Sequence, residues 1–233
     1  MADCYSPTEH AFYEEFQGVG KSSLVQLIAH SEAINNPSWT IGCAVEVKLH
    51  EYKEGTPFQK TYFIEMWDVG GSNSHRNTRH IFYNSFHGVI LVHDLTNRKS
   101  KQNLRKWLAE VLSKDNPGKK NNGWYNYDSE QFIDNPIPIL VIGTKQDLAM
   151  EVYPPGRTKR TASIAEECGA DEIYVDCRQI RSFAPGSSNA VKLSRYFDKV
   201  IEKKYQGQGG GFVSSAVDRR RLASYSNKQS HVD

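Results

Sequence analysis

The chain has no apolar run that approaches the roughly 18 residues needed to cross a membrane as a helix. Its first seventeen residues also lack the cationic start and apolar stretch of a secretory signal. Ala2 stands where myristoylation requires glycine, and residues 230–233 contain no cysteine that could carry a prenyl group. We therefore expect a cytoplasmic protein that has no stable membrane anchor of its own.

Neither charge sign is in excess, and cysteine is sparse. Lys and Arg total 29 against 27 Asp and Glu, which gives no broad cationic field, so we expect no nucleic-acid partner. The cysteines are Cys4, Cys43, Cys168 and Cys177. They show no Cys-x-x-Cys spacing and no neighbouring histidine pair, which favours reduced thiols over a zinc site or a disulfide framework.

Apolar runs of strand length alternate with helical patterns along the chain. Residues 88–94 and 137–143 are short continuous apolar runs, typical of parallel strands that are covered on both faces. Residues 101–112 and 190–204 repeat apolar side chains at helical spacing. The alternation predicts an α/β fold with a doubly wound, mostly parallel sheet and helices on both faces.

Two further stretches complete the predicted strands. Residues 43–52 alternate apolar and polar side chains, and the turn formers at 53–57 join them to a second strand at 62–68. This pattern predicts a hairpin with one exposed edge. Residues 173–177 form another short strand pattern.

The chain length of 233 residues suits one α/β domain with short appendages. We assign residues 1–17 to an atypical amino-terminal segment and residues 18–205 to the domain. Residues 115–135 are rich in turn formers and predict an insertion loop. Residues 206–233 combine glycines with an arginine run, which predicts a disordered basic tail.

A glycine-rich segment before a helical pattern resembles the end of a phosphate-binding loop. In such a loop, backbone N–H groups wrap the phosphates, a lysine reaches the outer phosphates and a hydroxyl holds Mg²⁺. The residues that fit these roles are Gly18, Gly20, Lys21, Ser22 and Ser23. The full motif requires glycine five residues before Gly20, where this chain has Glu15. Taken alone, the segment is also compatible with an ordinary glycine turn.

Polar residues follow the second hairpin strand. Asp68 emerges at a strand's carboxyl end, where ligands bind in doubly wound sheets. The N–H of Gly71 can approach a terminal phosphate, and Thr40 offers a hydroxyl from a loop. We therefore predict Ser22, Thr40 and Asp68 as ligands of Mg²⁺. The alternative is that residues 67–71 merely end a strand.

The segment at 144–147 also follows a predicted strand. The carboxylate of Asp147 can accept both N–H donors on the edge of guanine, while the stem of Lys145 covers the ring. Adenine presents an acceptor at one of those positions and is therefore disfavoured. We predict Thr144, Lys145 and Asp147 as base-binding residues, although Lys-x-Asp alone is common surface chemistry.

The order and spacing of these segments, together with residues 39–42, resemble the Ras superfamily of small GTPases over about residues 18–204. Residues 36–40, 67–72 and 186–192 resemble its Rab-like group. The resemblance implies binding of GTP/GDP with Mg²⁺ by an unprenylated, atypical GTPase. It further implies homodimer formation and a role in processing prenylated Ras-type proteins through a small-GTPase chaperone.

The same resemblance assigns a last base contact and exposes three departures. Cys177 and Arg178 occupy the place of the family's Ser-Ala-Lys loop and match it poorly. Ser72 replaces the glutamine that orients the attacking water, so we expect slow hydrolysis and assign no catalytic residue. Thr144 replaces an asparagine that braces the site, which should weaken guanine preference.

The third departure concerns the first strand. The family's central apolar strand corresponds here to residues 8–15, which have only three adjacent apolar positions. Glu14 and Glu15 would also lie near nucleotide phosphates, an unfavourable like-charge contact. We therefore expect a first strand that is altered or missing, because the chain has diverged or because its first exon belongs to another transcript.

Two functions remain open at this point. One is a slow GTPase switch in the processing or signalling of Ras-family proteins, whose loops present a partner surface with GTP and Mg²⁺. The other is a nucleotide-binding-impaired pseudo-GTPase that serves as a dimeric interaction scaffold.

Overall fold

The computed structural model describes residues 18–72, 76–83, 86–112, 136–152 and 163–206. In chain order the elements are α1 (Lys21–His30), β1 (Cys43–Tyr52), β2 (Lys60–Val69), α2 (Arg76–Arg79), η2 (His80–Tyr83), β3 (Val89–Asp94), α3 (Arg98–Gln102), α4 (Leu104–Leu112), β4 (Ile139–Thr144), α6 (Gln146–Val152), α7 (Ile164–Glu167), β5 (Asp171–Tyr174), η4 (Ile180–Phe183) and α8 (Ser188–Gln206). The predicted amino-terminal segment, the insertion loop and the tail beyond Gln206 lie outside the described residues.

A parallel sheet in the order β3-β4-β5 forms the centre of the domain. The apolar runs at 88–94 and 137–143 provide β3 and β4, as predicted, and Leu140, Val141 and Ile142 are fully buried. The third strand begins at Asp171, two residues before the predicted start. Beyond the end of β5 the chain remains hydrogen-bonded to β4, because the N–H of Val175 donates to the carbonyl of Gly143 at 2.8 Å.

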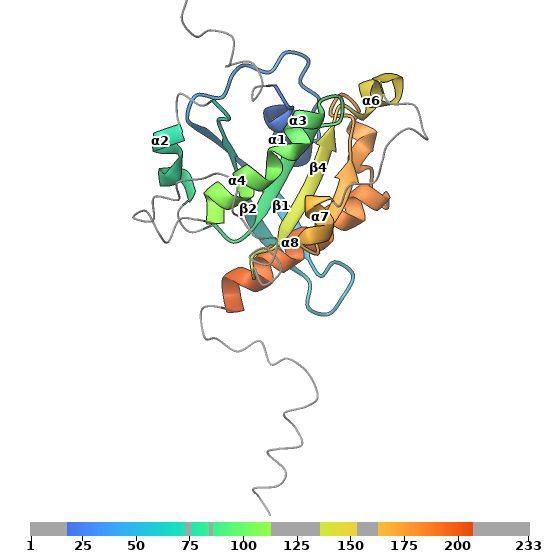
Figure 1. Cartoon of the computed structure of the whole chain (residues 1–233). Helices are drawn as coiled ribbons and strands as arrows, with labels where there is room; N and C mark the ends of the chain where they lie inside the picture. Colours follow the sequence, from blue (N-terminus) through green and yellow to red (C-terminus); the bar gives the residue numbers. More distant parts are fainter. Residues whose placement is uncertain (1–17, 73–75, 84–85, 113–135, 153–162, 207–233) are drawn as a thin grey trace, which may run out of the picture.

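Helices cover both faces of this sheet, as the alternating pattern predicted (Figure 1). Leu140 and Ile142 pack in one cluster with α1 and α8, whereas Val141 points to the opposite face and packs with α4 and α7. This division follows from the strand geometry, since successive side chains leave a strand on opposite faces. The buried face of α8 extends this packing through Leu193 and Phe197.

The helical pattern at 101–112 is divided between α3 and α4. Asn97 caps α3, because its side-chain oxygen accepts hydrogen bonds from the N–H groups of Lys99 and Ser100. Asn103 lies between the two helices with helical backbone angles, and its carbonyl accepts from the N–H of Trp107 at 3.1 Å. The two helices therefore follow each other directly.

The predicted hairpin is present as the antiparallel pair β1 and β2. Ile64 and Met66 on its inner face are buried in the same cluster as α1 and α8. Within the described residues this pair is a sheet separate from β3-β4-β5, and no strand there joins β2 to β3. The region predicted as an altered first strand, residues 8–15, lies outside the described part.

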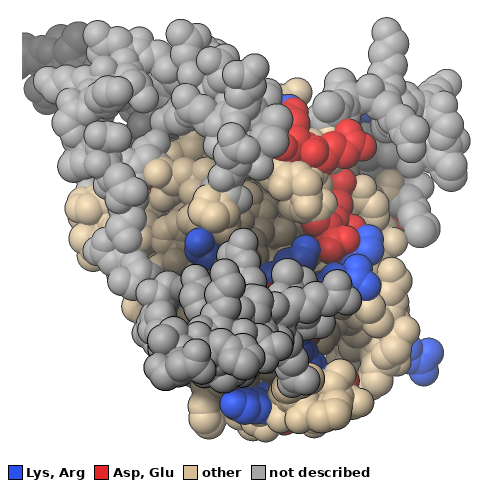
Figure 2. Space-filling model, turned by 90° about the horizontal axis from the view of Figure 1, so that it is seen from below, with Lys and Arg blue, Asp and Glu red and all other residues tan. Residues whose placement is uncertain are grey.

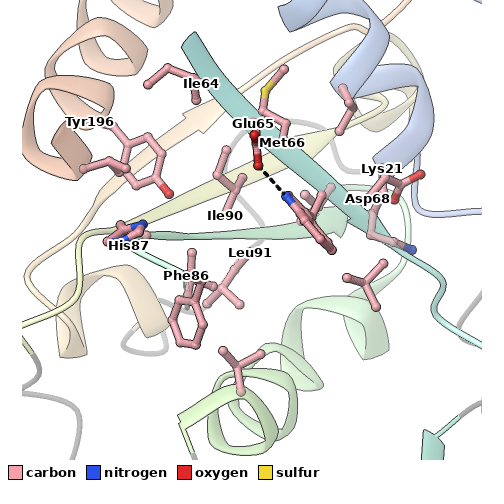
Figure 3. Close-up of a pocket in the computed structure, with 18 of the residues that line it drawn as sticks. Lys21, Ile64, Glu65, Met66, Asp68, Phe86, His87, Ile90, Leu91 and Tyr196 are labelled. Carbon is pink, nitrogen blue, oxygen red and sulfur yellow. Dashed lines mark hydrogen bonds between the residues drawn. The ribbon is translucent and has the colours of Figure 1, made fainter. Parts of the chain in front are cut away.

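An apolar groove of about 560 Å³ runs between β2 and β3 (Figure 3). Its lining includes Ile64 and Met66 from β2, Ile90 and Leu91 from β3, and Tyr196 from α8. Lys21 and Asp68 lie together at one end of the groove in Figure 3, so this end leads to the loops that carry the predicted site.

Charges of both signs share the surface. On the face shown in Figure 2, acidic side chains of the described residues form one run, with basic side chains beside it. Among the described helices, none is long and apolar enough to cross a membrane. Cys43, Cys168 and Cys177 are free thiols.

Candidate functional site

A cleft of about 550 Å³ opens beyond the carboxyl ends of β2, β4 and β5 and at the start of α1. It brings together residues that are far apart in the sequence. Those predicted to bind nucleotide all line it: Gly18, Gly20, Lys21, Ser22, Ser23, Gly71, Thr144, Lys145, Asp147, Cys177 and Arg178. Of the predicted metal ligands, Ser22 and Thr40 line the cleft, and Asp68 lies behind them, hydrogen-bonded to both.

Helix α1 points its amino terminus at the cleft. Gly20 precedes the helix with φ of 89°, and among the described residues no side-chain cap is found at this helix start. A Cβ at position 20 would lie 3.4 Å from the hydroxyl of Thr144, so glycine suits both the backbone angle and the close approach. An uncapped helix start with glycine before it is a favourable place for a phosphate.

Lys21 adds a cation to this helix start. Burial lowers the pKa of the Lys21 amine, the nearby Arg79 lowers it further and the carboxylate of Asp68 opposes both. A phosphate would act in the same direction as Asp68 and favour the charged amine. An anion bound at the helix start would therefore be stabilised by the charge of the Lys21 amine.

The three predicted metal ligands converge. Oδ2 of Asp68 accepts hydrogen bonds from the hydroxyls of Ser22 at 2.5 Å and Thr40 at 2.9 Å, and the two hydroxyls lie 2.9 Å apart. Asp68 is only 4% exposed, and its buried Oδ1 has no hydrogen-bond partner among the described residues. A buried carboxylate oxygen without a partner is costly, and hard oxygen donors are those that Mg²⁺ prefers. These residues fit a magnesium ion.

The loops that carry Thr40 and Gly71 contact each other through the backbone. The N–H of Gly70 donates to the carbonyl of Gly42 at 2.8 Å. A Cβ at Gly70 would lie 2.6 Å from the carbonyl oxygen of Thr40, so a larger residue would push the loops apart. Sequence reasoning assigned no role to Gly70; the signal that could have found it is the glycine pair after Asp68.

Thr144 braces the phosphate loop. Its hydroxyl lies 2.6 Å from the carbonyl oxygen of Val19 and 3.0 Å from that of His93, and it can donate to either. The loss of the family's asparagine therefore does not leave the loop unbraced, because a shorter side chain makes the contact. The side chain of Thr144 is fully buried, which keeps the hydroxyl in place.

The predicted base-binding segment, residues 144–147, is held by a residue that the sequence analysis missed. The amine of Lys145 lies 2.6 Å from Oδ2 of Asp94, at the end of β3. Burial acts to raise the pKa of Asp94, but hydrogen bonds from Lys145 and Thr96 outweigh it and lower that pKa. The pair fixes the Lys145 stem at the cleft. Asp147 is half-buried in the first turn of α6.

Cys177 and Arg178 lie opposite this segment. Burial, with the carboxylates of Asp176 and Asp147, raises the pKa of the Cys177 thiol to about 12, so the thiol is neutral. The N–H of Arg178 donates to the side chain of Asp176 at 2.9 Å. Asp176, Cys177 and Arg178 all line the cleft, and the Cys177 thiol contributes a small neutral side chain to it.

Ser72 lies at the cleft beside Gly71. Its carbonyl oxygen accepts a hydrogen bond from Nη1 of Arg79 at 2.9 Å. A serine side chain is too short to reach as far as the glutamine that the family usually has at this position.

Comparison with known proteins shows the family to which the chain belongs. The family model described as "Ras of Complex, Roc, domain of DAPkinase" matches residues 16–122. Rab-like protein 3 of Mus musculus is 53% identical over 223 residues, which cover 93% of this chain and 94% of that protein. The chain belongs to the Rab-like small GTPases.

Two further relatives extend the comparison of this Rab-like GTPase. Rab-like protein 3 of Homo sapiens is 52% identical over 93% of this chain and 94% of its own length. Small GTPase LIP1 of Arabidopsis thaliana is 37% identical over 81% of this chain and 58% of its own length. The family assignment and the α/β fold predicted from the motifs are thus confirmed.

Proposed function

We propose that this small GTPase binds GDP and GTP with Mg²⁺ in the cleft and acts as a slow guanine-nucleotide switch. The observation that carries the proposal is the convergence of Ser22, Thr40 and Asp68 beside the uncapped start of α1. Family membership supports a guanine nucleotide as the ligand.

Each residue has a role in this proposal. The N–H groups of Gly18–Ser23 and the amine of Lys21 bind the phosphates. Ser22, Thr40 and Asp68 hold the magnesium ion, which neutralises phosphate charge when bound. Asp147 accepts the guanine N–H donors, while Lys145, fixed by Asp94, covers the ring. Thr40 and Gly71 come from two loops that contact each other, so a terminal phosphate can bind to both loops at once.

Nucleotide binding is the first test. Fluorescent GDP and GTP should bind the purified chain with sub-micromolar affinity in Mg²⁺, and excess ATP should not displace them. Lys21→Ala should abolish this binding, whereas Lys199→Ala, an exposed lysine on α8, should leave it unchanged. A folded wild-type chain that binds neither nucleotide would overturn the switch.

Slow hydrolysis is the second part of the proposal. The short side chain of Ser72 cannot orient water as a glutamine does, and misplacement of a reacting group costs on the order of 10²-fold in rate. Ser72→Gln should therefore raise single-turnover GTP hydrolysis, by about tenfold or more. Several turnovers per minute from the unaltered chain alone would contradict the proposal.

We propose that the switch works in the cytoplasm on the processing or signalling of Ras-family proteins, through a small-GTPase chaperone. A pull-down from cytosol with GDP and with a non-hydrolysable GTP analogue tests this. Recovery of such a chaperone that depends on the nucleotide supports the switch. Equal recovery with both nucleotides supports a scaffold.

One observation favours the scaffold as a second candidate function. The outer face of the hairpin carries exposed apolar side chains that lie opposite each other across the two strands: Val45 with Trp67, and Leu49 with Phe63. Contiguous exposed apolar side chains mark interaction surfaces. A homodimer that uses this face should be lost in Phe63→Asp but kept in Val191→Asp, an exposed apolar position on α8. Light scattering gives the oligomeric state, and a monomeric wild-type chain would exclude the dimer.

A further inference from the structure

Residues 186–192 resemble the Rab-like group, yet they line neither the cleft nor the groove. They form the start of α8. The hydroxyl of Ser187 accepts a hydrogen bond from the N–H of Ala190 at 3.2 Å, which caps the helix. The segment therefore fixes where α8 begins, and it directs two polar side chains, Asn189 and Lys192, toward strand β5.

These two side chains bind the backbone of β5. Nδ2 of Asn189 donates to the carbonyl of Tyr174 at 2.9 Å, and Nζ of Lys192 donates to the carbonyl of Glu172 at 3.0 Å. Within the described residues β5 pairs only with β4, so its other edge has no strand partner there. A backbone carbonyl requires a hydrogen-bond donor, and α8 supplies donors here in place of a neighbouring strand.

The bond to Tyr174 lies close to the base end of the cleft. Tyr174 is the last residue of β5, and Cys177, which lines the cleft, follows three residues later. On the other side, the N–H of Val175 donates to the carbonyl of Gly143 at 2.8 Å, and the carbonyl of Val175 accepts from the N–H of Gln146 at 3.2 Å. The chain that leads to Cys177 is thus held between α8 and the predicted base-binding segment.

Cys177 also lies near the predicted acceptor of guanine. The carboxylate of Asp147 contributes to the raised pKa of the Cys177 thiol, which requires the two side chains to be near each other. Both residues line the cleft, Asp147 from α6 and Cys177 from the loop after β5. The distance between them therefore limits the space in which a base can lie.

We propose that Asn189 is a positioning residue that fixes the distance between Cys177 and Asp147, so that a guanine base can align with the carboxylate. It acts through the carbonyl of Tyr174 and does not itself line the cleft. Helix α8 thereby takes part in base selection without contacting the nucleotide. The bond from Lys192, which is two residues farther back along β5, holds only the strand. This inference rests on the proposed nucleotide binding.

The chain offers a matched pair of variants. Asn189→Asp keeps the size of the side chain but has no N–H to donate, and aspartate in the first turn of a helix stabilises that helix. Lys192→Met is the control, because it removes the equivalent bond from the same helix to the same strand. Circular dichroism and urea unfolding establish that each variant is folded.

Amide hydrogen exchange, measured by NMR without nucleotide, tests whether Asn189 holds the loop. The N–H groups of Arg178 and Gln179 both donate to Asp176, so their exchange reports on the loop after β5. Asn189→Asp should speed this exchange by about tenfold or more, and Lys192→Met should not.

The affinities for GDP and for inosine diphosphate supply a readout that a purely structural role would not move. Inosine diphosphate lacks the 2-amino group of guanine, so it has only one of the two N–H donors that Asp147 accepts. A loss of stability would weaken the binding of both nucleotides alike, whereas a misaligned base loses the advantage of guanine. The ratio of the two dissociation constants, inosine diphosphate to GDP, should fall by about threefold or more in Asn189→Asp and stay within about 1.5-fold in Lys192→Met.

An exchange rate or an affinity ratio in Asn189→Asp that matches Lys192→Met would overturn the inference. If the unaltered chain binds neither nucleotide, the proposed function fails. The exchange measurement, made without nucleotide, still decides whether Asn189 holds the loop, so the two failures are distinguishable.

Discussion

The cleft and the groove formed by the described residues have nearly equal volumes, but they are built in different ways. The nucleotide cleft, about 550 Å³, is lined by loops that begin or end regular elements, and its polar groups are held by contacts such as Thr144 to Val19 and Lys145 to Asp94. The groove, about 560 Å³, is lined by apolar side chains of β2, β3 and α8 (Figure 3).

The cleft is formed by local sequence motifs, whereas the groove is formed by contacts between distant parts of the chain. The cleft depends on short motifs, each of which carries its own turn, cap or side-chain contact. The groove depends on which strands pair, because within the described residues β2 pairs only with β1, and β3 only with β4. A substitution in one of these motifs therefore changes the polar contacts at one place in the cleft. The shape of the groove depends instead on how the two sheets pack against each other.

The largest predicted effect is on the free energy of unfolding, and it should distinguish side chains of the groove from those of the hydrophobic core. Leu140→Ala removes a side chain that is 0% exposed in the centre of the parallel sheet, and we expect a loss of about 2–5 kcal/mol in the free energy of unfolding. Ile90→Ala, at a half-buried position in the groove, should cost about 1 kcal/mol, since less contact is lost.

Urea unfolding of both variants measures these costs. Because both positions are on strands of the same sheet, they form a matched pair. Equal losses of unfolding free energy in the two variants would contradict this distinction, since they would mean that Ile90 is packed in solution as tightly as Leu140.

The second prediction concerns the cleft alone. Asp147→Ala removes the charged acceptor for the guanine N–H donors, so the affinity for GDP and GTP should fall by about 3 kcal/mol, a hundredfold or more. The free energy of unfolding without nucleotide should change little. Titration with fluorescent nucleotide checks this, with Glu54→Ala, an exposed residue of the hairpin turn, as the control. Unchanged affinity in Asp147→Ala would move the base site elsewhere.

The third prediction concerns Glu172, a partly buried carboxylate that lines neither the cleft nor the groove. His93 and Lys101 hold the pKa of Glu172 down to about 2, against burial, which raises it. A lowered carboxyl pKa stabilises the fold above the ordinary value near 4.5, and this stabilisation is lost as the pH falls toward 2. Glu172→Gln should therefore cost about 1–3 kcal/mol at pH 7, and the difference from wild type should shrink between pH 4.5 and 2. A difference that is constant with pH would contradict this origin.

Much of the site could be predicted because its residues follow strands or open a helix. The pattern at 137–147 contains both the buried strand and the base segment, so Thr144, Lys145 and Asp147 are placed by β4 itself. Asp94 could not be predicted, since its contact with Lys145 joins the ends of two parallel strands and leaves no local pattern. Arg79 is similar, because its partners are 7 and 31 residues away.

The fold shows the same limit. Alternation and apolar runs predicted the hairpin and the parallel strands, because each signal lies within one element. The start of α3 depends on capping by Asn97, and the earlier start of β5 depends on its register with β4, a strand distant in the sequence. The groove was not predicted, because no local pattern states which strand edges stay apart.

The smallest effect tests whether a hydroxyl can replace the family's carboxamide at the boundary between the phosphate loop and the base segment. Thr144→Val keeps the shape but leaves the carbonyl of Val19 without its donor, which should cost about 1–2 kcal/mol in nucleotide affinity. Thr144→Asn restores an amide donor and should keep or raise the affinity for GDP. Competition with ATP, measured for all three chains, shows whether the brace also serves base selection. If Thr144→Val binds as tightly as wild type, the hydroxyl contact carries no energy, and the cleft owes its shape to backbone packing around Gly20 alone.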